Sequence, residues 1–510
     1  MPALAPRLRP EVTIASAGAT ADLGRAGGLF VRAPTAVQTV FGVTAASSVH
    51  NVRKGRNLGW RAGSGWLAAV IPAGCRRVRV HDRQLADALT AAGAEQVERD
   101  PDVEIARSAR DIRGDAALAL VLVDPLLPTS RRLTVRVARR LAVSVRARLY
   151  AERARRGLRR RGYGEASVLL WDARQRVGLP DVPPHRPRLV ERLPARALAI
   201  GRRGDTGPSA LQAVLVDASR QTGVPLRLRW VSIRSGILLA EAEEGILRVA
   251  IGPGRVQIES QATALETLGG DQLPAAVADR VPWLLARGRT GLADWSLERR
   301  LPGTRPAASL SDQLARDCLE FLVALHRAPG GESGGQSLSE LAEIAAGVCG
   351  RDGAGRARSL AARLDAALAG VRRGFGHGDF FAGNLLAEDG RLTGVLDWDA
   401  AGPGRLPLVD LLHLELTQRG YGTDNEWGPT LLEHLLPAAR DGGGEHVRRY
   451  CRNVGLDPHP RLLEGLVLSY WLGYVAYQLR THPARRSEPL WIERNVEGIL
   501  REVEQPRHGR

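Results

Sequence analysis

The chain has 510 residues, of which 44% are hydrophobic and 25% charged, and this composition predicts a globular protein of more than one domain. The formal net charge is +17, and because Lys54 is the only lysine, nearly all of the positive charge is arginine. Two explanations stay open: the codon bias of a GC-rich genome, or a polyanionic partner.

The sequence does not indicate a secretory signal, a disulfide framework, a zinc site or a membrane span. Residues 1–24 lack the apolar core of a secretory signal, and the longest apolar runs, such as 117–123, are too short to cross a membrane. The four cysteines are far apart and form no CxxC or Cys/His cluster. We therefore expect a reduced, cytoplasmic environment.

The first part of the chain predicts a loose segment followed by an α/β domain. Residues 1–45 are rich in Ala, Gly and Pro, whereas residues 46–180 alternate strand and helix patterns. Strands are predicted at 66–74, 76–82, 117–124 and 166–172, and helices at 83–94 and about 130–161. Such alternation predicts a parallel, Rossmann-like layer. No G-x-G-x-x-G follows a strand, so we assign this domain no cofactor.

Residues 181–209 are rich in Pro and Arg and predict a linker. Beyond it the pattern predicts a small sheet lobe, residues 210–303, and a mainly helical lobe, residues 304–510. The sheet lobe has short strand signals at 226–233, 237–242, 246–251 and 295–303 and a helix signal at 256–270. Residues 330–337, "GGESGGQS", predict a flexible insert in the helical lobe.

The helical lobe contains a set of residues suited to phosphoryl transfer. The stretch "HGDFFAGN" places Asn384 five residues after Asp379, and "VLDWD" places Asp397 at the end of a predicted strand. In this chemistry one carboxylate accepts the proton of the attacking hydroxyl, while an Asn oxygen and a second carboxylate hold Mg²⁺. On its own, however, the HGD sequence is equally typical of a turn.

Three motifs together resemble those of the aminoglycoside phosphotransferase and choline kinase family. They are "HGDFFAGN", "VLDWD" and "GRLPLVDL", in the family's order and with similar spacing, and "LVALHRA" resembles the helix that precedes the catalytic loop. The resemblance covers about residues 211–501. It implies an α+β, two-lobed protein-kinase-like fold with ATP and Mg²⁺ as cofactors.

The resemblance also implies roles for single residues. Asp379 would be the catalytic base, Asn384 and Asp397 would bind Mg²⁺, and His377 would be a structural member of the catalytic loop. Asp410 would brace this loop by hydrogen bonds, with an N-cap for the next helix as the alternative.

In the sheet lobe the family's phosphate-binding basic residue falls on Arg248, with a solvated strand arginine as the alternative. The usual partner acid on the next helix falls on Gln261, so the helix–strand ion pair is either absent or rebuilt. The stretch "SIRSG" stands where a phosphate-covering loop belongs, although an ordinary hairpin turn is the alternative. Adenine would contact the hinge near Glu298. The candidate nucleotide-binding residues are therefore Arg248, Ser232, Arg234, Ser235, Gly236 and Glu298.

We expect an ATP-dependent phosphotransferase that acts on a hydroxyl of a small molecule, such as a sugar, a nucleoside-like compound or another metabolite. The alternative is a kinase-like binding or regulatory protein with weak or no activity. Tyr470, Tyr474 and Tyr477 share one helical face and predict either a choline-type cage or core packing. A nucleic-acid partner is not expected, a membrane surface stays open for the Arg-rich helix, and the oligomeric state is not indicated.

Overall fold

The computed structural model describes residues 64–123, 133–172, 194–234, 236–269, 273–306, 309–328, 335, 337–420 and 427–504. The chain divides into two compact units. We call Lys54–Glu266 with Pro282–Arg300 the sheet unit, and Thr267–Val281 with Leu301–Arg510 the helical unit. The predictions for residues 1–45, for 181–193 and for most of the insert at 330–337 lie outside the described residues.

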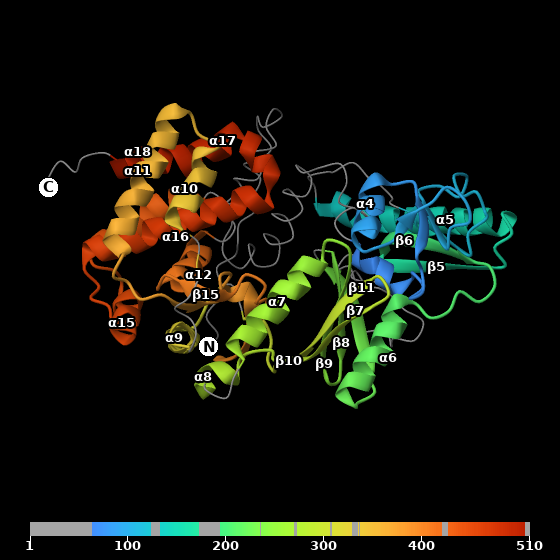
Figure 1. Cartoon of the computed structure of the whole chain (residues 1–510), viewed down its shortest axis with the longest axis horizontal. Coiled ribbons are helices and arrows are strands. Elements are labelled where there is room, and N and C mark those ends of the chain that lie inside the picture. Colours follow the sequence, from blue (N-terminus) through green and yellow to red (C-terminus); the bar gives the residue numbers. More distant parts are fainter. Residues whose placement is uncertain are drawn as a thin grey trace, which may run out of the picture. The chain divides into compact units, whose positions relative to one another are not determined.

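The first sheet of the sheet unit has the strand order β2-β1-β3-β4-β6-β5. Its strands are β1 (Arg77–Val80), β2 (Glu95–Gln96), β3 (Val103–Ala106), β4 (Leu118–Val123), β5 (Glu165–Asp172) and β6 (Pro194–Arg202). The first four run parallel, whereas β6 is antiparallel to both of its neighbours. The parallel strands confirm the predicted α/β layer. Its helices are α4 (Arg83–Ala91) and α5 (Leu133–Arg160), and α5 packs along β6 and β5 (Figure 1).

Two local predictions for this region were wrong. Residues 194–202, expected in a linker, form β6 between β4 and β5, and Ala197 and Ala199 of this strand are fully buried. Residues 66–74, expected as a strand, contain instead a short 3-10 helix, Gly65–Ala69, that is buried on nearly all sides. A short run that is apolar at every position does not distinguish a strand from a buried helical turn, because neither periodicity is visible in it.

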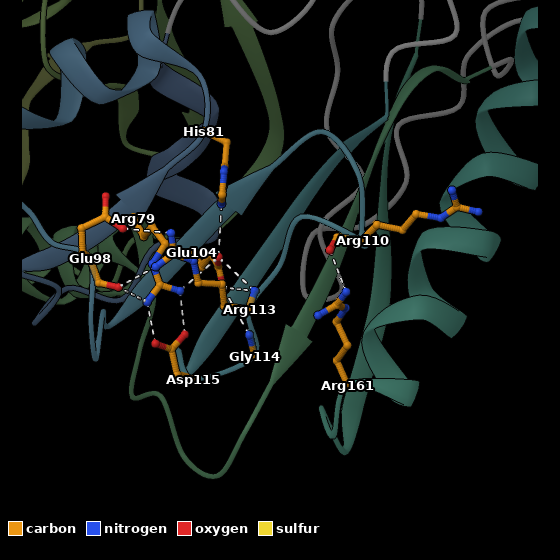
Figure 2. A network of polar contacts seen from close by, with 9 residues as sticks. All are labelled: Arg79, His81, Glu98, Glu104, Arg110, Arg113, Gly114, Asp115 and Arg161. Atoms are coloured by element: carbon orange, nitrogen blue, oxygen red, sulfur yellow. Dashed lines mark hydrogen bonds and ion pairs between the residues drawn. The ribbon is translucent and has the colours of Figure 1, made fainter.

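Polar residues hold the chain that follows β3 against the six-stranded sheet (Figure 2). The fully buried carboxylate of Glu104 lies 3.2 Å from Nη1 of Arg79 and 3.2 Å from Nε2 of His81, and it accepts the backbone N–H of Arg113 at 3.0 Å. Arg79 also donates two hydrogen bonds to Asp115, at 2.7 and 2.5 Å, which lowers the pKa of Asp115 to about 2. The buried charges are therefore paired, as burial requires.

The second sheet of the sheet unit is antiparallel and has the order β10-β11-β9-β8-β7. Its strands are β7 (Leu228–Arg234), β8 (Ile237–Ala242), β9 (Gly245–Ile251), β10 (Leu284–Thr290) and β11 (Ala293–Arg299). The strands expected at 226–233, 237–242, 246–251 and 295–303 correspond to β7, β8, β9 and β11, and the expected helix is α7 (Arg255–Leu268). The helix α6 (Ala210–Thr222) and strand β10 were not predicted.

One apolar core joins the two sheets. It contains Ile105 and Leu120 of the six-stranded sheet together with Leu247 and Trp295 of the five-stranded sheet. The backbones also approach closely, since a Cβ on Gly252, which has a φ of 82°, would lie 2.4 Å from the carbonyl oxygen of Ala88. The regions expected as a separate α/β domain and a separate sheet lobe therefore pack as one unit.

The helical unit is built around α16 (Pro460–Thr481), which contacts α10, α11 and α14 (Figure 1). Its other helices are α8 (Ala275–Ala278), α9 (Asp312–His326), α10 (Leu338–Ala346), α11 (Arg351–Leu368), α12 (Val409–Gly420), α13 (Trp427–Thr430), α14 (Leu436–Arg440), α15 (Glu445–Val454), α17 (Pro489–Ile492) and α18 (Gly498–Glu504). Two small antiparallel pairs join β12 (Gly374–Gly376) to β15 (Gly402–Arg405) and β13 (Leu385–Glu388) to β14 (Arg391–Val395).

The six-stranded sheet confirms the predicted α/β layer, and the antiparallel sheet followed by helices agrees with the predicted α+β region. Among the residues that the structure describes, no helix is both long enough and apolar enough to cross a membrane.

Candidate functional site

The β13–β14 hairpin brings Asn384 and Asp397 to one end. Asn384 precedes the first strand and Asp397 follows the second, and the N–H of Leu396 donates to the carbonyl of Asn384 at 2.8 Å. Asp397 has a φ of 68°, which is a left-handed conformation that few residues other than glycine adopt. The sequence therefore places two oxygen-bearing side chains together through one tight hairpin.

Asp379 lies beside Asn384 on the loop that precedes the hairpin. Nδ2 of Asn384 donates at 3.0 Å both to the carbonyl oxygen of Asp379 and to its carboxylate Oδ2. Because the amide nitrogen is used in this way, Oδ1 of Asn384 is the atom that could bind a metal ion. The Asp379 side chain is 43% exposed, so its carboxylate can be reached by a substrate.

Asp410 braces this loop from the first turn of α12, as expected. Its Oδ2 accepts the backbone N–H of His377 and its Oδ1 that of Gly378, both at 2.7 Å. Gly378 has a φ of 81°, and a Cβ there would lie 2.4 Å from the carbonyl oxygen of Ala400. The glycine of the HGD motif is therefore required by both backbone conformation and space.

His377 is fully buried between the loop and the segment that carries Asp397. Its Nε2 lies 3.0 Å from the carbonyl oxygen of Leu396, and its ring packs edge-on against Trp398 at 4.8 Å. Burial lowers the pKa of His377, so the ring is neutral and Nε2 donates to that carbonyl. The geometry is that of a structural link and not of an acid or base that meets solvent.

The sequence analysis did not single out His413, which is a direct neighbour of Asp379. Nε2 of His413 lies 3.3 Å from Oδ1 of Asp379, and Nδ1 lies 2.9 Å from the hydroxyl of Tyr470. The ring stacks on Trp427 at 6.1 Å. A signal was present, because His413 follows Asp410 by three residues and so shares its face of the helix.

The tyrosine stripe of α16 divides into two parts. Tyr470 is buried beside His413, and Tyr474 packs edge-on against Trp427 at 4.9 Å, whereas Tyr477 is exposed. Burial raises the pKa of Tyr470 well above its ordinary value, so its hydroxyl stays protonated. Core packing is thus the outcome for Tyr470 and Tyr474.

Arg248 lies in β9 of the sheet unit, and its Nε is 3.0 Å from Oε1 of Glu298 on β11. Only 9% of Arg248 and 2% of Glu298 are exposed, so the alternative of a solvated strand arginine was wrong. Leu247 and Val249 point into the shared core on the other face, as the strand alternation predicted. Glu298 itself lies within β11, where it pairs with Ile246.

The helix partner expected for Arg248 is Gln261 on α7, and its side chain is only 1% exposed. Neither Nε2 nor Oε1 of Gln261 has a hydrogen-bond partner within the described part of the chain. The neighbouring acids pair elsewhere, Glu259 with Arg255 at 3.2 Å and Glu266 with Arg287 at 3.1 Å. The ion pair is therefore rebuilt inside the sheet, through Glu298.

The stretch expected to cover phosphate forms the β7–β8 connection. Ser232 lies in β7 with a buried hydroxyl, Arg234 ends that strand, and Gly236 has a φ of 86°. Ser235 lies outside the described residues. The hairpin turn is present, and phosphate binding by this turn stays a prediction.

Residues 246–449 match the model of a family described as the phosphotransferase enzyme family. The match confirms the resemblance that the motifs predicted, and it includes Arg248, Asp379, Asn384 and Asp397. It lies within the predicted range of 211–501. A comparison with curated proteins found no match.

Several solved structures resemble part of the chain. A thermostable mutant of an aminoglycoside phosphotransferase, in ternary complex with ADP and hygromycin B, has 16% identity and a TM-score of 0.36, covering 58% of this chain and 100% of that one. An ADP-bound aminoglycoside phosphotransferase has 15% identity and a TM-score of 0.38, covering 57% and 97%. A macrolide 2'-phosphotransferase from Brachybacterium faecium has 20% identity and a TM-score of 0.32, covering 59% and 100%.

Proposed function

We propose that this chain, a phosphotransferase in its residues 246–449, transfers the γ-phosphoryl group of ATP to a hydroxyl of a small molecule. The observation that carries the proposal is the joining of Asp379, Asn384 and Asp397 by one loop and one hairpin. Asn384 bonds the base candidate through its side chain, and through its backbone it bonds Leu396, which adjoins Asp397.

Asn384 and Asp397 fit a Mg²⁺ site in which the phosphates of the nucleotide supply the other ligands. Within the described ranges no group of three or more His, Cys, Asp or Glu side chains could hold a metal ion by itself. Oδ1 of Asn384 and the Asp397 carboxylate are hard oxygen donors, and Mg²⁺ commonly takes one or two protein ligands and completes its shell with phosphate and water. When bound, the ion neutralises charge on the phosphates.

The proposal gives each of the chain's own residues a separate role in the reaction. Asp379 accepts the proton of the acceptor hydroxyl, while Asn384, His377 and Asp410 hold its loop in place. In the sheet unit, Arg248 holds nucleotide phosphate by charge-assisted hydrogen bonds. Catalysis of this kind rests on positioning and electrostatics more than on covalent chemistry.

The acceptor is a sugar, a nucleoside-like hydroxyl or an anionic metabolite. A polycationic acceptor is disfavoured because the chain carries a formal charge of +17, which repels cations at a distance. The alternative of a weakly active, nucleotide-binding regulatory protein is favoured by one observation. Arg248 is already neutralised by Glu298, so phosphate must compete for it.

Turnover of Mg-ATP by the purified full chain, measured across sugars, nucleosides and amino alcohols, tests the proposal. Asp379→Asn keeps the size of the side chain and removes the base, so kcat should fall at least ~100-fold with little change in ATP affinity. An Asp379→Asn protein with wild-type turnover would show that the transfer chemistry lies elsewhere. Binding of ATP without turnover of any acceptor would favour the regulatory alternative.

A further inference from the structure

We propose that His413 is a positioning residue for Asp379, and that the Tyr470 hydroxyl fixes the imidazole tautomer that this role requires. The inference rests on the proposed function of Asp379. Its evidence is a continuous line of contacts inside the helical unit. The Tyr470 hydroxyl is 2.9 Å from Nδ1 of His413, and Nε2 of His413 is 3.3 Å from Oδ1 of Asp379.

The proposal assigns proton positions for a neutral imidazole at His413. An ionised carboxylate can only accept hydrogen bonds, so Nε2 of His413 must carry the proton that faces Asp379. In a neutral imidazole the other nitrogen, Nδ1, is then an acceptor. The Tyr470 hydroxyl, buried and protonated, is the donor that satisfies it. The carboxylate of Asp379 thus fixes the proton on Nε2 of His413, and this leaves Nδ1 as the acceptor for the Tyr470 hydroxyl.

The two oxygens of Asp379 are held by different partners. Oδ2 accepts from Nδ2 of Asn384 at 3.0 Å, and Oδ1 lies 3.3 Å from Nε2 of His413. With a partner at each oxygen the carboxylate is held in one orientation, while the Asp379 side chain stays 43% exposed and can be reached by a hydroxyl. Without His413, the Asp379 carboxylate would have a partner at only one oxygen and could rotate about its Cβ–Cγ bond.

The surroundings of His413 favour a fixed ring. It is only 9% exposed, it stacks on Trp427, and Phe381 meets it edge-on at 6.3 Å. Packing on several sides prevents the imidazole from flipping, which would exchange its two nitrogens.

Three variants of the full chain separate positioning from packing. His413→Leu removes the donor to Asp379 but keeps an apolar side chain against Trp427. His413→Gln keeps an N–H near the place of Nε2. Tyr470→Phe removes only the hydroxyl. The probe is Mg-ATP, with water or any acceptor found in the screen, and thermal unfolding checks that each variant is folded.

We expect His413→Leu to lower kcat about 10- to 100-fold, since hydrogen bonds to charged groups and small misplacements have effects of this size. KM for ATP should change less than about threefold, because Asp379 acts on the acceptor side. His413→Gln should recover most of the loss, and Tyr470→Phe should lie between the two. In the His413→Leu background, Tyr470→Phe should have little further effect on kcat, as expected of residues that act in series.

The same inference predicts a spectroscopic signal that does not depend on activity. In ¹⁵N-histidine-labelled protein, the His413 resonances are assigned by their loss in His413→Gln. They should show a protonated Nε2 and an unprotonated Nδ1, and Tyr470→Phe should shift the Nδ1 resonance. A protonated Nδ1 in the wild type would overturn the inference. A wild-type kcat in folded His413→Leu would overturn it also, whereas a wild-type protein without any turnover would overturn the proposed function itself.

Discussion

Two residues of the candidate site adopt a positive φ, and this bears on how they can be tested. Gly378 has a φ of 81° and Asp397 a φ of 68°. Glycine adopts such angles freely, and Asp and Asn tolerate them better than most other residues. Alanine at 397 would therefore change backbone preference as well as charge. Asparagine keeps the preference and removes the charge alone.

Asp397→Asn should greatly reduce the stabilisation of the protein by Mg-ATP. In the proposed metal site the carboxylate would be the charged ligand. A ligand at 100 times its dissociation constant stabilises by about 2.7 kcal/mol, most of which should disappear. Thermal unfolding with and without Mg-ATP measures this. Asp399→Asn, a neighbouring carboxylate without an assigned role, is the matched control. Equal nucleotide-induced shifts in wild type and Asp397→Asn would remove Asp397 from the metal site.

Arg248→Ala should weaken ATP binding by about 10- to 150-fold, the range expected for charge-assisted bonds worth roughly 1.5–3 kcal/mol. The change also leaves Glu298 buried without its partner, which is destabilising. Glu298→Gln in the same chain removes that unpaired charge and separates the two effects. Arg248→Lys should recover part of the affinity, because lysine binds phosphate as a point charge. Identical dissociation constants in calorimetric titrations of these proteins would assign the phosphate contact to another residue.

Asp379, Asn384 and Asp397 could be found from the sequence because their spacing is local and each motif is contiguous. The contact between Asp410 and the loop was also expected, since the two motifs occur in a fixed order. The partners of Arg248 and His413 could not be found in this way. Glu298 is fifty residues from Arg248 and Tyr470 fifty-seven from His413, so only tertiary packing shows that they meet.

At the scale of single elements, the hairpins were the most predictable features. Strands β8 and β9 are short and mainly apolar, and glycine lies beside each, so pattern and turn agree. Strand β6 was missed because Pro194, Arg196 and Arg202 lie near its two ends, although residues 197–201 between them are small or apolar. Its pairing with β4 and β5 stabilises it as a strand, although its sequence does not have a clear strand pattern.

Glu104 of β3 should be important for stability and not for catalysis. Glu104→Gln removes a fully buried charge that lies 3.2 Å from Arg79. Because Arg79 keeps its two hydrogen bonds to Asp115, the loss should cost about 1–3 kcal/mol. Denaturant unfolding measures the change. Glu98→Gln is the matched control, because its exposed carboxylate pairs with an exposed arginine and should contribute little. Equal stability of both variants would mean that the buried pair contributes nothing net.

At the scale of the whole molecule, the division into units differs from the division that the sequence predicts. The Pro- and Arg-rich stretch suggested a boundary between an α/β domain and a sheet lobe, yet α6, which follows it, begins at Ala210 and packs into the core of both. Composition describes the local chain, whereas a shared core depends on which faces meet. The five-stranded sheet therefore gains its apolar support from the six-stranded sheet.

This arrangement predicts one unfolding transition for the sheet unit. Ile105 and Leu247 lie in different sheets but in the same core. Ile105→Ala and Leu247→Ala should therefore each lower the midpoint temperature of the same calorimetric transition, with a loss of about 2–5 kcal/mol in the free energy of unfolding. Leu364→Ala in α11 of the helical unit is the control and should lower a different transition or, if the whole chain unfolds as one, the single common one. If Ile105→Ala lowers a transition that Leu247→Ala leaves unchanged, the two sheets unfold independently. The α/β layer would then be a separate domain and not the support of the five-stranded sheet.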